Sequence, residues 1–296
     1  MRSVAKTQHR LDIIFAVLGF SAMAICIMVL CGLLVNMAID GLPRLSLDFF
    51  TEFPSRRAAQ AGILSAWVGS FLVMIITAAV AIPVGIASAV YLEEYSRKNF
   101  ITDIIEINIT NLAGVPSIVY GLLALGLFVY TFGFGQSILS AGLTLGLLIL
   151  PIVIVATRES LRSIPIHIRE AAYACGASRW QVCQDHLLPY STPGILTGVI
   201  IGLSRAIGET APVITIGALT FIAFLPPVPL VDGGLFDWIH SAFTVMPIQI
   251  FNWTSRPNPD FHVNAAAASV VLVFLTLGMN ALAIWLRYRM RKNIKW

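Results

Sequence analysis

The chain has 296 residues, of which 57% are hydrophobic and only 11% are charged, and its formal net charge is +4. A soluble globule of this length cannot bury so large an apolar fraction, so the composition excludes a soluble domain. We expect lipid to be the solvent of this chain, and we expect no nucleic-acid partner.

Six apolar segments are long enough to cross a bilayer, because a hydrocarbon core of about 30 Å requires about 20 helical residues. Backbone groups in lipid must be hydrogen-bonded within the protein, and the sequence lacks the alternation of a transmembrane barrel. The prediction is an all-α integral membrane protein with six transmembrane helices. In chain order the segments are Ile13–Ile39, Ala61–Leu92, Asn111–Phe134, Ile138–Thr157, Gly194–Leu225 and Val263–Tyr288.

The first segment follows basic residues, as a secretory signal does, but its apolar stretch exceeds the usual length of about 7–15 residues. No small-x-small cleavage site follows it, so we expect a retained anchor. Three parts of the chain are expected from these segments. They are residues 1–60 with the first helix and an outer loop, residues 61–288 with five helices, and a basic tail at 289–296.

Lys and Arg are concentrated at the two termini and in the loops after the second and fourth segments. Positively charged loops stay in the cytoplasm, so both termini are predicted to be cytoplasmic, an N-in and C-in topology. Residues 158–190 then form a cytoplasmic loop, and residues 226–262 form an outer loop. The basic residues on the predicted cytoplasmic side are Arg2, Lys6, Arg10, Arg97, Lys98, Arg158, Arg162, Arg169, Arg179, Arg287, Arg289, Arg291, Lys292 and Lys295.

Motifs of nucleotide hydrolysis and of membrane-enzyme catalysis are missing from the sequence. No Gly-Lys dipeptide occurs, which excludes a Gly-x-x-x-x-Gly-Lys phosphate loop, and neither His-Glu-x-x-His nor Gly-x-Ser-x-Gly is present. The cysteines lack metal-ligand spacing. We expect a non-catalytic chain that binds no cofactor and no metal itself.

The loop between the fourth and fifth segments is polar and helix-prone. Pro165 is expected to separate two helices, with Arg169 and Glu170 at the start of the second. Ala172 and Gly176 are four residues apart and are expected to share one helix face. Small residues on that face would let another surface approach closely.

The same loop carries a Glu-Ala-Ala, Gly, Leu-Pro pattern, and Pro189 is placed to end the loop and begin the next helix. The pattern resembles the coupling motif of permeases in type I ABC importers, which have the MetI-like fold and dock on an ATPase through this loop. His186 departs from that family, which usually has an aliphatic residue there. The alternative is an ordinary amphipathic turn. The residues that the resemblance assigns to ATPase coupling are Glu170, Ala171, Ala172, Gly176, Leu188 and Pro189.

The fifth segment contains Arg205 and Glu209, and ionised groups are costly in lipid. Arg205 lies about 16 Å along a helix from Gly194, near mid-membrane, and can pair with Glu209 four residues later. Pro212 has no N–H, so the carbonyl of Gly208 loses its partner and the helix is expected to break. Broken helices at this depth line water-filled paths, so we expect a translocation route. The alternative is a structural ion pair.

A guanidinium in such a route suits a tetrahedral oxyanion, because its planar fork donates two parallel hydrogen bonds. The run Arg-Ala-Ile-Gly-Glu-Thr-Ala-Pro at residues 205–212 resembles the signature of PstA-type permeases of bacterial phosphate-specific ABC transporters. Residues 114–121 and 246–251 are also similar to that family, and the likeness covers about residues 60–290. The resemblance places in the phosphate path Arg205, Gly208, Glu209, Thr210 and Pro212.

The resemblance also implies a function, partners and a location. The implied function is the permease of an ATP-driven inorganic phosphate importer that works by alternating access. The implied partners are a PstC-type second permease in a heterodimer, a homodimeric ATPase that binds ATP and magnesium, and an extracytoplasmic phosphate-binding protein. The implied location is the bacterial plasma (inner) membrane, which the chain crosses several times. The alternatives are an importer of sulfate or molybdate, or a non-transporting membrane scaffold.

Two further segments each have two interpretations. The outer loop at 226–262 is rich in Pro and aromatic residues, which suits an interfacial segment or a contact with a binding protein. Residues 114–121 contain a proline and two glycines, which suits a broken helix on the route or close helix packing.

Overall fold

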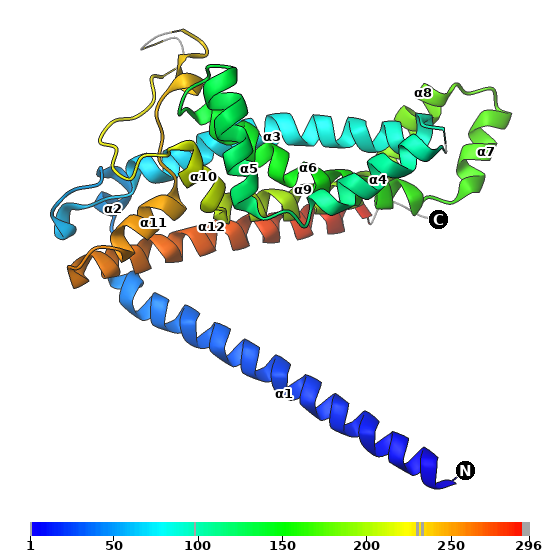
Figure 1. The fold of residues 1–296 in the computed structure, drawn as a ribbon, viewed down its shortest axis with the longest axis horizontal. Coiled ribbons are helices and arrows are strands. Elements are labelled where there is room, and N and C mark those ends of the chain that lie inside the picture. The colour runs from blue at the N-terminus through cyan, green and yellow to red at the C-terminus, as the bar shows by residue number, and fades with distance from the viewer. Residues whose placement is uncertain (1, 98, 229–230, 232–233, 292–296) are drawn as a thin grey trace.

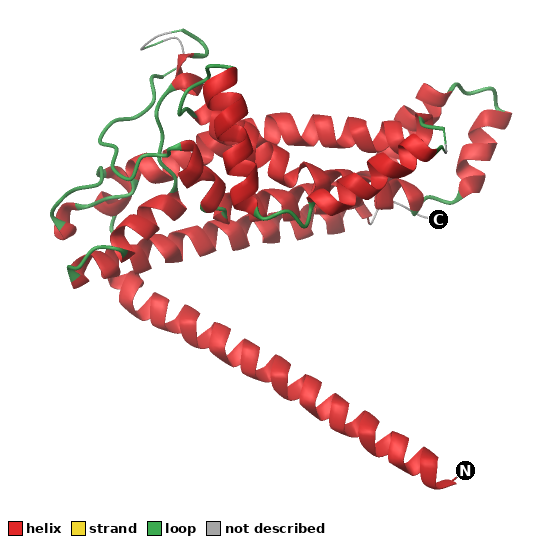
Figure 2. Ribbon diagram, in the orientation of Figure 1, coloured by secondary structure: helices red, strands yellow, loops and turns green. Residues whose placement is uncertain are grey.

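The computed structural model describes residues 2–97, 99–228, 231 and 234–291, and every regular element in this part of the chain is helical (Figure 2). The all-α prediction is therefore confirmed. Of the residues predicted to lie on the cytoplasmic side, Lys98 and residues 292–296 of the basic tail lie outside the described residues. The side chains of residues 2–11 and 291 are also outside that description.

Five helices in the described chain are long and apolar enough to cross a membrane. Each has at least 25 residues, more than the about 20 that a straight crossing requires. In Figure 1 these spans correspond to α1 (Arg2–Gly41), α3 (Leu64–Val90), α6 (Ile138–Arg162), α9 (Leu188–Gly208) and α12 (Pro259–Arg291).

Helices α3, α6, α9 and α12 lie side by side and form the body of the molecule (Figure 1). Small residues allow these helices to pack closely. A Cβ added to Gly85 of α3 would come within 2.7 Å of Val153 of α6, and Gly198 of α9 packs directly on Ala156 of α6. Helix α6 is accordingly the most buried of the spans.

Helix α1 diverges from this body and touches it only near its C-terminal end (Figure 1). There, a Cβ on Gly41 would come within 2.7 Å of the backbone of Ala266 in α12. Arg44 follows and donates a hydrogen bond of 2.9 Å from Nε to the Asn264 side chain. The apolar side chains of α1 are otherwise left uncovered by the described chain, so the predicted first helix is present but belongs to no internal core.

The third predicted span differs from the structure. Instead of one helix from Asn111, the chain forms α4 (Phe100–Leu112), turns by 107°, and continues as α5 (Ser117–Ala124) and the π-helix η4 (Leu125–Thr131). Pro116 caps α5 with an extended backbone, which stops the preceding helix. The bent pair supplies the sixth span only if it counts as one.

The fifth predicted span also differs. The helix begins earlier than Gly194, because residues 179–208 form one helix that contains α8 (Arg179–Gln181), the π-helix η5 (Val182–Leu187) and α9. It breaks after Gly208, resumes as α10 (Ala211–Ile216), and ends at Gly217, whose φ of 98° lies in the left-handed region. Residues 218–225 are not helical. The break predicted from Pro212 is therefore present, but the end of the span was predicted too late.

Short elements cover both ends of the bundle. One end, on the left of Figure 1, carries α2 (Leu47–Thr51) and α11 (Met246–Thr254), whose Phe49 and Trp253 are fully buried against each other. The other end carries α7 (Ile166–Ala174) and α8, and the C-terminal end of α12 lies on the same side. The remaining short helices of the described chain are η1 (Leu42–Arg44), η2 (Ala58–Gln60), η3 (Tyr91–Tyr95) and η6 (Asp237–His240).

Candidate functional site

The break between α9 and α10 holds the predicted charge pair. Arg205 lies in the last turn of α9, and Glu209 follows the helix with an extended backbone at φ −77° and ψ 119°. Arg205 donates a hydrogen bond of 3.2 Å from Nε to Glu209 Oε1. The Arg205 side chain is 40% exposed, and neither of its Nη groups has a hydrogen bond within the described residues. The guanidinium therefore keeps free donors on an open face.

Residues next to Arg205 on α9 contact the neighbouring helices. Ser204 and Asn280 of α12 form a side-chain hydrogen bond of 2.5 Å. Gly202 packs on Ile149 and Val153 of α6.

Arg205 lies on the exposed face of α9 with Ile201 and Gly208, whereas Gly202 and Ala206 are buried. Because this segment is apolar enough to cross a membrane and a guanidinium in lipid is costly, we expect its open face to meet water or another polar surface.

Two broken segments meet beside this pair. Helix α5 packs on α10, and Gly121 lies so close to Thr215 that a side chain has no room there. An added Cβ on Gly121 would also come within 2.7 Å of the Pro212 backbone. The Tyr120 hydroxyl donates a hydrogen bond of 2.8 Å to the Leu112 carbonyl across the bend before α5. Gly121 thus allows α5 and α10 to pack closely. This packing joins the bend before α5 to the break between α9 and α10.

The other predicted path residues surround the same break. Gly208 is exposed, and an added Cβ would meet no atom within 4 Å. Thr210 precedes α10, and Pro212 is buried in its first turn. The structure therefore places together all five residues that the sequence assigned to this region.

The coupling residues lie at the end of the molecule that carries α7 (Figure 1). Pro165 separates α6 from α7, as predicted, but Arg169 and Glu170 lie in the middle of α7 rather than at its start. Glu170 points outward with 63% of its side chain exposed, next to His167 at 3.3 Å. Ala171 is exposed as well.

The predicted shared face of Ala172 and Gly176 is absent. Ala172 is buried against Val182, Cys183 and Leu187, so it attaches α7 to η5 instead of meeting another protein. Gly176 follows the helix with φ 84°, in the left-handed region that glycine tolerates without strain. The i to i+4 argument fails because α7 ends before Gly176.

Leu188 and Pro189 lie inside a helix that does not stop for them. Leu188 packs against the buried cluster at η5, whereas Pro189 is exposed. The prediction that Pro189 ends the loop is wrong, because a π-helical turn at residues 182–187 carries the helix past it. A continuous helix of 30 residues therefore runs from Arg179 to Gly208. It spans roughly 45 Å and joins the coupling end to Arg205.

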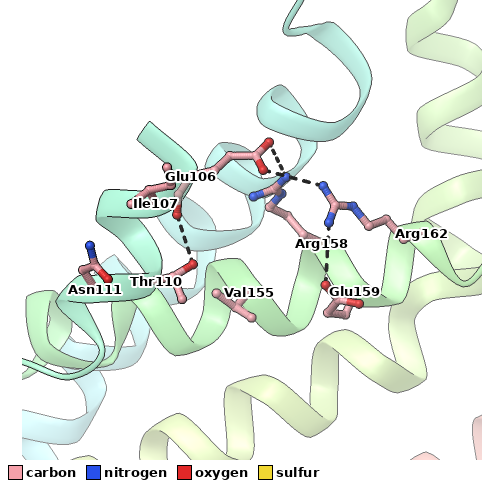
Figure 3. Close-up of a pocket in the computed structure, with 8 residues that line it drawn as sticks. All are labelled: Glu106, Ile107, Thr110, Asn111, Val155, Arg158, Glu159 and Arg162. Atoms are coloured by element: carbon pink, nitrogen blue, oxygen red, sulfur yellow. Dashed lines mark hydrogen bonds and ion pairs between the residues drawn. The ribbon is translucent and has the colours of Figure 1, made fainter. Parts of the chain in front are cut away.

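A cluster of ion pairs joins η3, α4, α6 and α7, and the sequence pattern did not predict these contacts. We call it the charge network. Arg158 of α6 contacts Glu106 at 2.5 Å and Glu93 at 3.5 Å, contacts that are ion pairs without hydrogen-bond geometry (Figure 3). Arg162 donates to Glu93 at 2.9 Å. The members of the charge network are Glu93, Glu94, Glu106, Arg158, Arg162 and Arg169.

A pocket of about 330 Å³ lies beside the charge network, between α4 and α6 (Figure 3). Its charged groups pair with one another, since Arg162 also contacts Glu159 at 3.8 Å. The uncharged lining residues are Ile107, Thr110, Asn111 and Val155. No group of three or more His, Cys, Asp or Glu side chains that could hold a metal occurs within the described residues.

Comparison with known proteins identifies the family. Residues 81–295 match the family described as binding-protein-dependent transport system inner membrane component. The chain is 33% identical to the probable ABC transporter permease protein YqgI of Bacillus subtilis, over 92% of this chain and 93% of that protein. It is 30% identical to the phosphate transport system permease protein PstA of Haemophilus influenzae, over 93% of this chain and 92% of that protein.

A solved structure agrees on the fold. The inward-facing MetNI methionine ABC transporter matches with a TM-score of 0.57 and 16% identity, over 75% of this chain and 94% of that one. At this identity the likeness concerns the fold alone, and it confirms the predicted importer-permease architecture. The chain therefore belongs to the binding-protein-dependent transport system inner membrane components: it is a multi-pass, non-catalytic permease of the inner membrane, whose ATPase is a separate protein.

Proposed function

We propose that this chain is the transmembrane permease of an ATP-driven importer of inorganic phosphate. The observation that carries the proposal is the exposed Arg205 guanidinium at the α9–α10 break, whose Nε pairs with Glu209 while both Nη groups keep free donors within the described residues. The names of the phosphate permeases of Haemophilus influenzae and Mycobacterium leprae support this cargo.

The pair of opposite charges suits phosphate better than sulfate or molybdate. The two Nη groups of Arg205 can donate to two oxygens of a tetrahedral anion. An ionised Glu209 only accepts hydrogen bonds, so it repels an anion without protons. Phosphate keeps at least one proton near neutral pH and can donate it to Glu209. In this proposal Glu209 holds Arg205 in place and selects a protonated oxyanion.

The break itself supplies the local geometry of the proposed path. Gly208 leaves space beside Arg205 because it has no side chain, and Pro212 keeps α10 from continuing α9. Thr210 adds a hydroxyl at the turn. We assign these three residues, with Arg205 and Glu209, to the lining of the path.

We assign the partners of the proposed complex to the exposed surfaces of this chain. A PstC-type second permease would cover the Arg205 face in a heterodimer and enclose a watered path. A homodimeric ATPase, which binds ATP and magnesium, would dock on α7 through its exposed Glu170 and Ala171. Ala172, Gly176, Leu188 and Pro189 would hold and shape that docking element. An extracytoplasmic phosphate-binding protein would deliver the cargo.

The chain divides accordingly into three proposed parts. Residues 1–60 contain the separate first helix and an outer loop, and residues 61–288 form the permease core. Residues 289–296 form the basic tail. The coupling segment at about 158–190 and the outer loop at about 226–262 belong to the core.

The cargo can be tested in proteoliposomes that contain the complete complex, with an ATP-regenerating system in the lumen and the binding protein outside. We expect ATP-dependent uptake of labelled phosphate that excess sulfate or molybdate does not inhibit. Uptake of labelled sulfate or molybdate at a comparable rate would assign the chain to another oxyanion importer. ATP hydrolysis that is never accompanied by uptake of any of these anions would support the scaffold alternative.

A further inference from the structure

We propose that Arg169, together with Glu94, is the positioning link that makes α7 follow the membrane helices as one body. The inference rests on the proposed docking of an ATPase on α7. Arg169 and Glu94 are 75 residues apart in sequence, and neither was assigned a role in coupling or in the path. In the structure they join three separate elements.

The Arg169 guanidinium makes four hydrogen bonds with its five N–H donors. Its Nε and Nη2 donate to Glu94 Oε1 at 3.2 Å and 2.8 Å. Its Nη1 donates to the Ile164 carbonyl at 3.2 Å, and its Nη2 also donates to the Leu161 carbonyl at 3.0 Å. Leu161 belongs to the last turn of α6, and Ile164 precedes α7. One side chain therefore ties α7 to the end of α6 and to η3.

The burial of this pair makes the link strong. The side chains of Arg169 and Glu94 are only 17% and 10% exposed. Fully exposed ion pairs contribute little, whereas removing one partner of a buried pair leaves an uncompensated charge. Arg169 also keeps two carbonyls at the end of α6 and beyond it hydrogen-bonded. Loss of its guanidinium would leave Glu94 and both carbonyls without that donor.

Two consecutive glutamates of the π-helical turn η3 hold two different helices. Residues 91–95 form this turn at the end of α3. Glu93 contacts Arg158 and Arg162 of α6, while Glu94 contacts Arg169 of α7, because consecutive side chains of a helix point in different directions. Such π-turns are frequent at functional sites.

Helix α7 is thus attached at two points that lead to different spans. Ala172 packs on η5, which continues into α9 and Arg205. Arg169 binds Glu94, which continues into α3, and α3 packs along α6. The apolar cluster around Ala172 also includes Val90 of α3, so α3 is held by both attachments. Without Arg169, α7 keeps the apolar cluster but loses the ion pair to η3 and the hydrogen bonds to the end of α6, so a push on α7 is transmitted less rigidly.

The experiment compares Arg169→Gln with Arg169→Lys and Arg97→Gln in the reconstituted complex. Arg97 is an exposed arginine of the same side of the molecule, and its side chain has no ion pair within the described residues. For Arg169→Gln we expect the ATP hydrolysis stimulated by phosphate-loaded binding protein to fall about tenfold, a typical coupling effect. Basal hydrolysis and the amount of ATPase that co-purifies should change less than about twofold, because docking is intact.

The other variants keep the proposal falsifiable if Arg169→Gln folds poorly. Arg169→Lys keeps the charge but cannot reach Glu94 and both carbonyls at once, so stimulation should be intermediate. Arg97→Gln should behave as wild type. Unchanged stimulation in Arg169→Gln, or an equal fall in basal and stimulated hydrolysis, would overturn the proposed link. A wild-type complex that shows no phosphate-dependent activity would instead contradict the proposed function.

Discussion

Two arginine–glutamate pairs of this chain have the same chemistry and opposite surroundings. In the charge network, Arg169 makes four hydrogen bonds and is 17% exposed. At the helix break, Arg205 makes one hydrogen bond, to Glu209, and is 40% exposed. The hydrogen bonds of Arg169 are all made to groups of this chain. Both Nη groups of Arg205 lack a hydrogen bond within the described residues, although Arg205 lies in a segment that crosses the membrane.

The difference teaches how one residue type serves two purposes. A largely buried guanidinium with four hydrogen bonds stabilises an arrangement, because removing it leaves its carboxylate partner unpaired. An unsaturated guanidinium in a membrane span is costly unless something polar reaches it. The first design suits a mechanical link, and the second suits a surface that contacts an anion temporarily. The variants below test this contrast.

The largest effect is expected from breaking the charge network at its most buried member. Arg158→Met removes the more buried of the two guanidinium groups that face Glu93 and Glu106, which should destabilise the chain by about 3–5 kcal/mol. Arg162→Met is the matched control, because that side chain is 45% exposed and should cost about 1 kcal/mol or less. Thermal unfolding in detergent micelles measures both. Equal, small losses would show that the network is not a buried structural unit.

A medium loss of stability is expected where α5 packs on α10, because this contact depends on close packing and not on charge. Gly121→Ala forces a methyl group against Thr215 and the Pro212 backbone, which should cost about 1–3 kcal/mol and reduce uptake. Gly126→Ala is the control, because an added Cβ there meets no atom within 4 Å. Thermal unfolding and phosphate uptake are compared for the two variants. A harmless Gly121→Ala would mean that α5 and α10 do not depend on this contact.

The smallest loss of stability is expected from substitutions of Gly176, in the turn that follows α7. Gly176→Ala places a Cβ in a left-handed residue with φ 84°, which should cost about 1 kcal/mol through backbone strain alone, since the site is open. Gly176→Asn should cost less, because asparagine tolerates this conformation. The melting temperatures of the two variants show whether backbone strain causes the loss of stability. A larger loss for asparagine than for alanine would point to a steric contact instead of strain.

Local features of the helix break could be predicted from the sequence. Arg205 and Glu209 are four residues apart, so helix geometry alone brings them together, and a proline without an N–H marks the break beside them. The six apolar segments were predicted because the length and apolar composition of a segment are enough to identify a candidate membrane helix. These predictions depended only on neighbouring residues.

The remaining features depend on contacts between distant residues or on helix irregularities. Glu94 and Arg169 are 75 residues apart, and nothing in either local pattern signals their contact. Pro189 was predicted to end the loop and begin a helix, but the helix already starts at Arg179 and continues through the π-turn at residues 182–187. The direct connection from Arg179 to Arg205 was therefore missed. The length of an apolar segment does not show where a helix bends or ends. The bend before Ser117 and the end of α10 before Gly217 were therefore not predicted.

The claim that the free donors of Arg205 serve the cargo is tested most directly by phosphate uptake of Arg205→Gln in proteoliposomes. Arg287→Gln is the control, because Arg287 is an exposed arginine of α12 whose side chain has no ion pair within the described residues.

We expect Arg205→Gln to lower phosphate uptake at least about hundredfold, equivalent to about 2.7 kcal/mol, while Arg287→Gln and the melting temperatures of both variants stay close to wild type. Phosphate uptake by Arg205→Gln at the wild-type rate would contradict the assignment of Arg205 to the path.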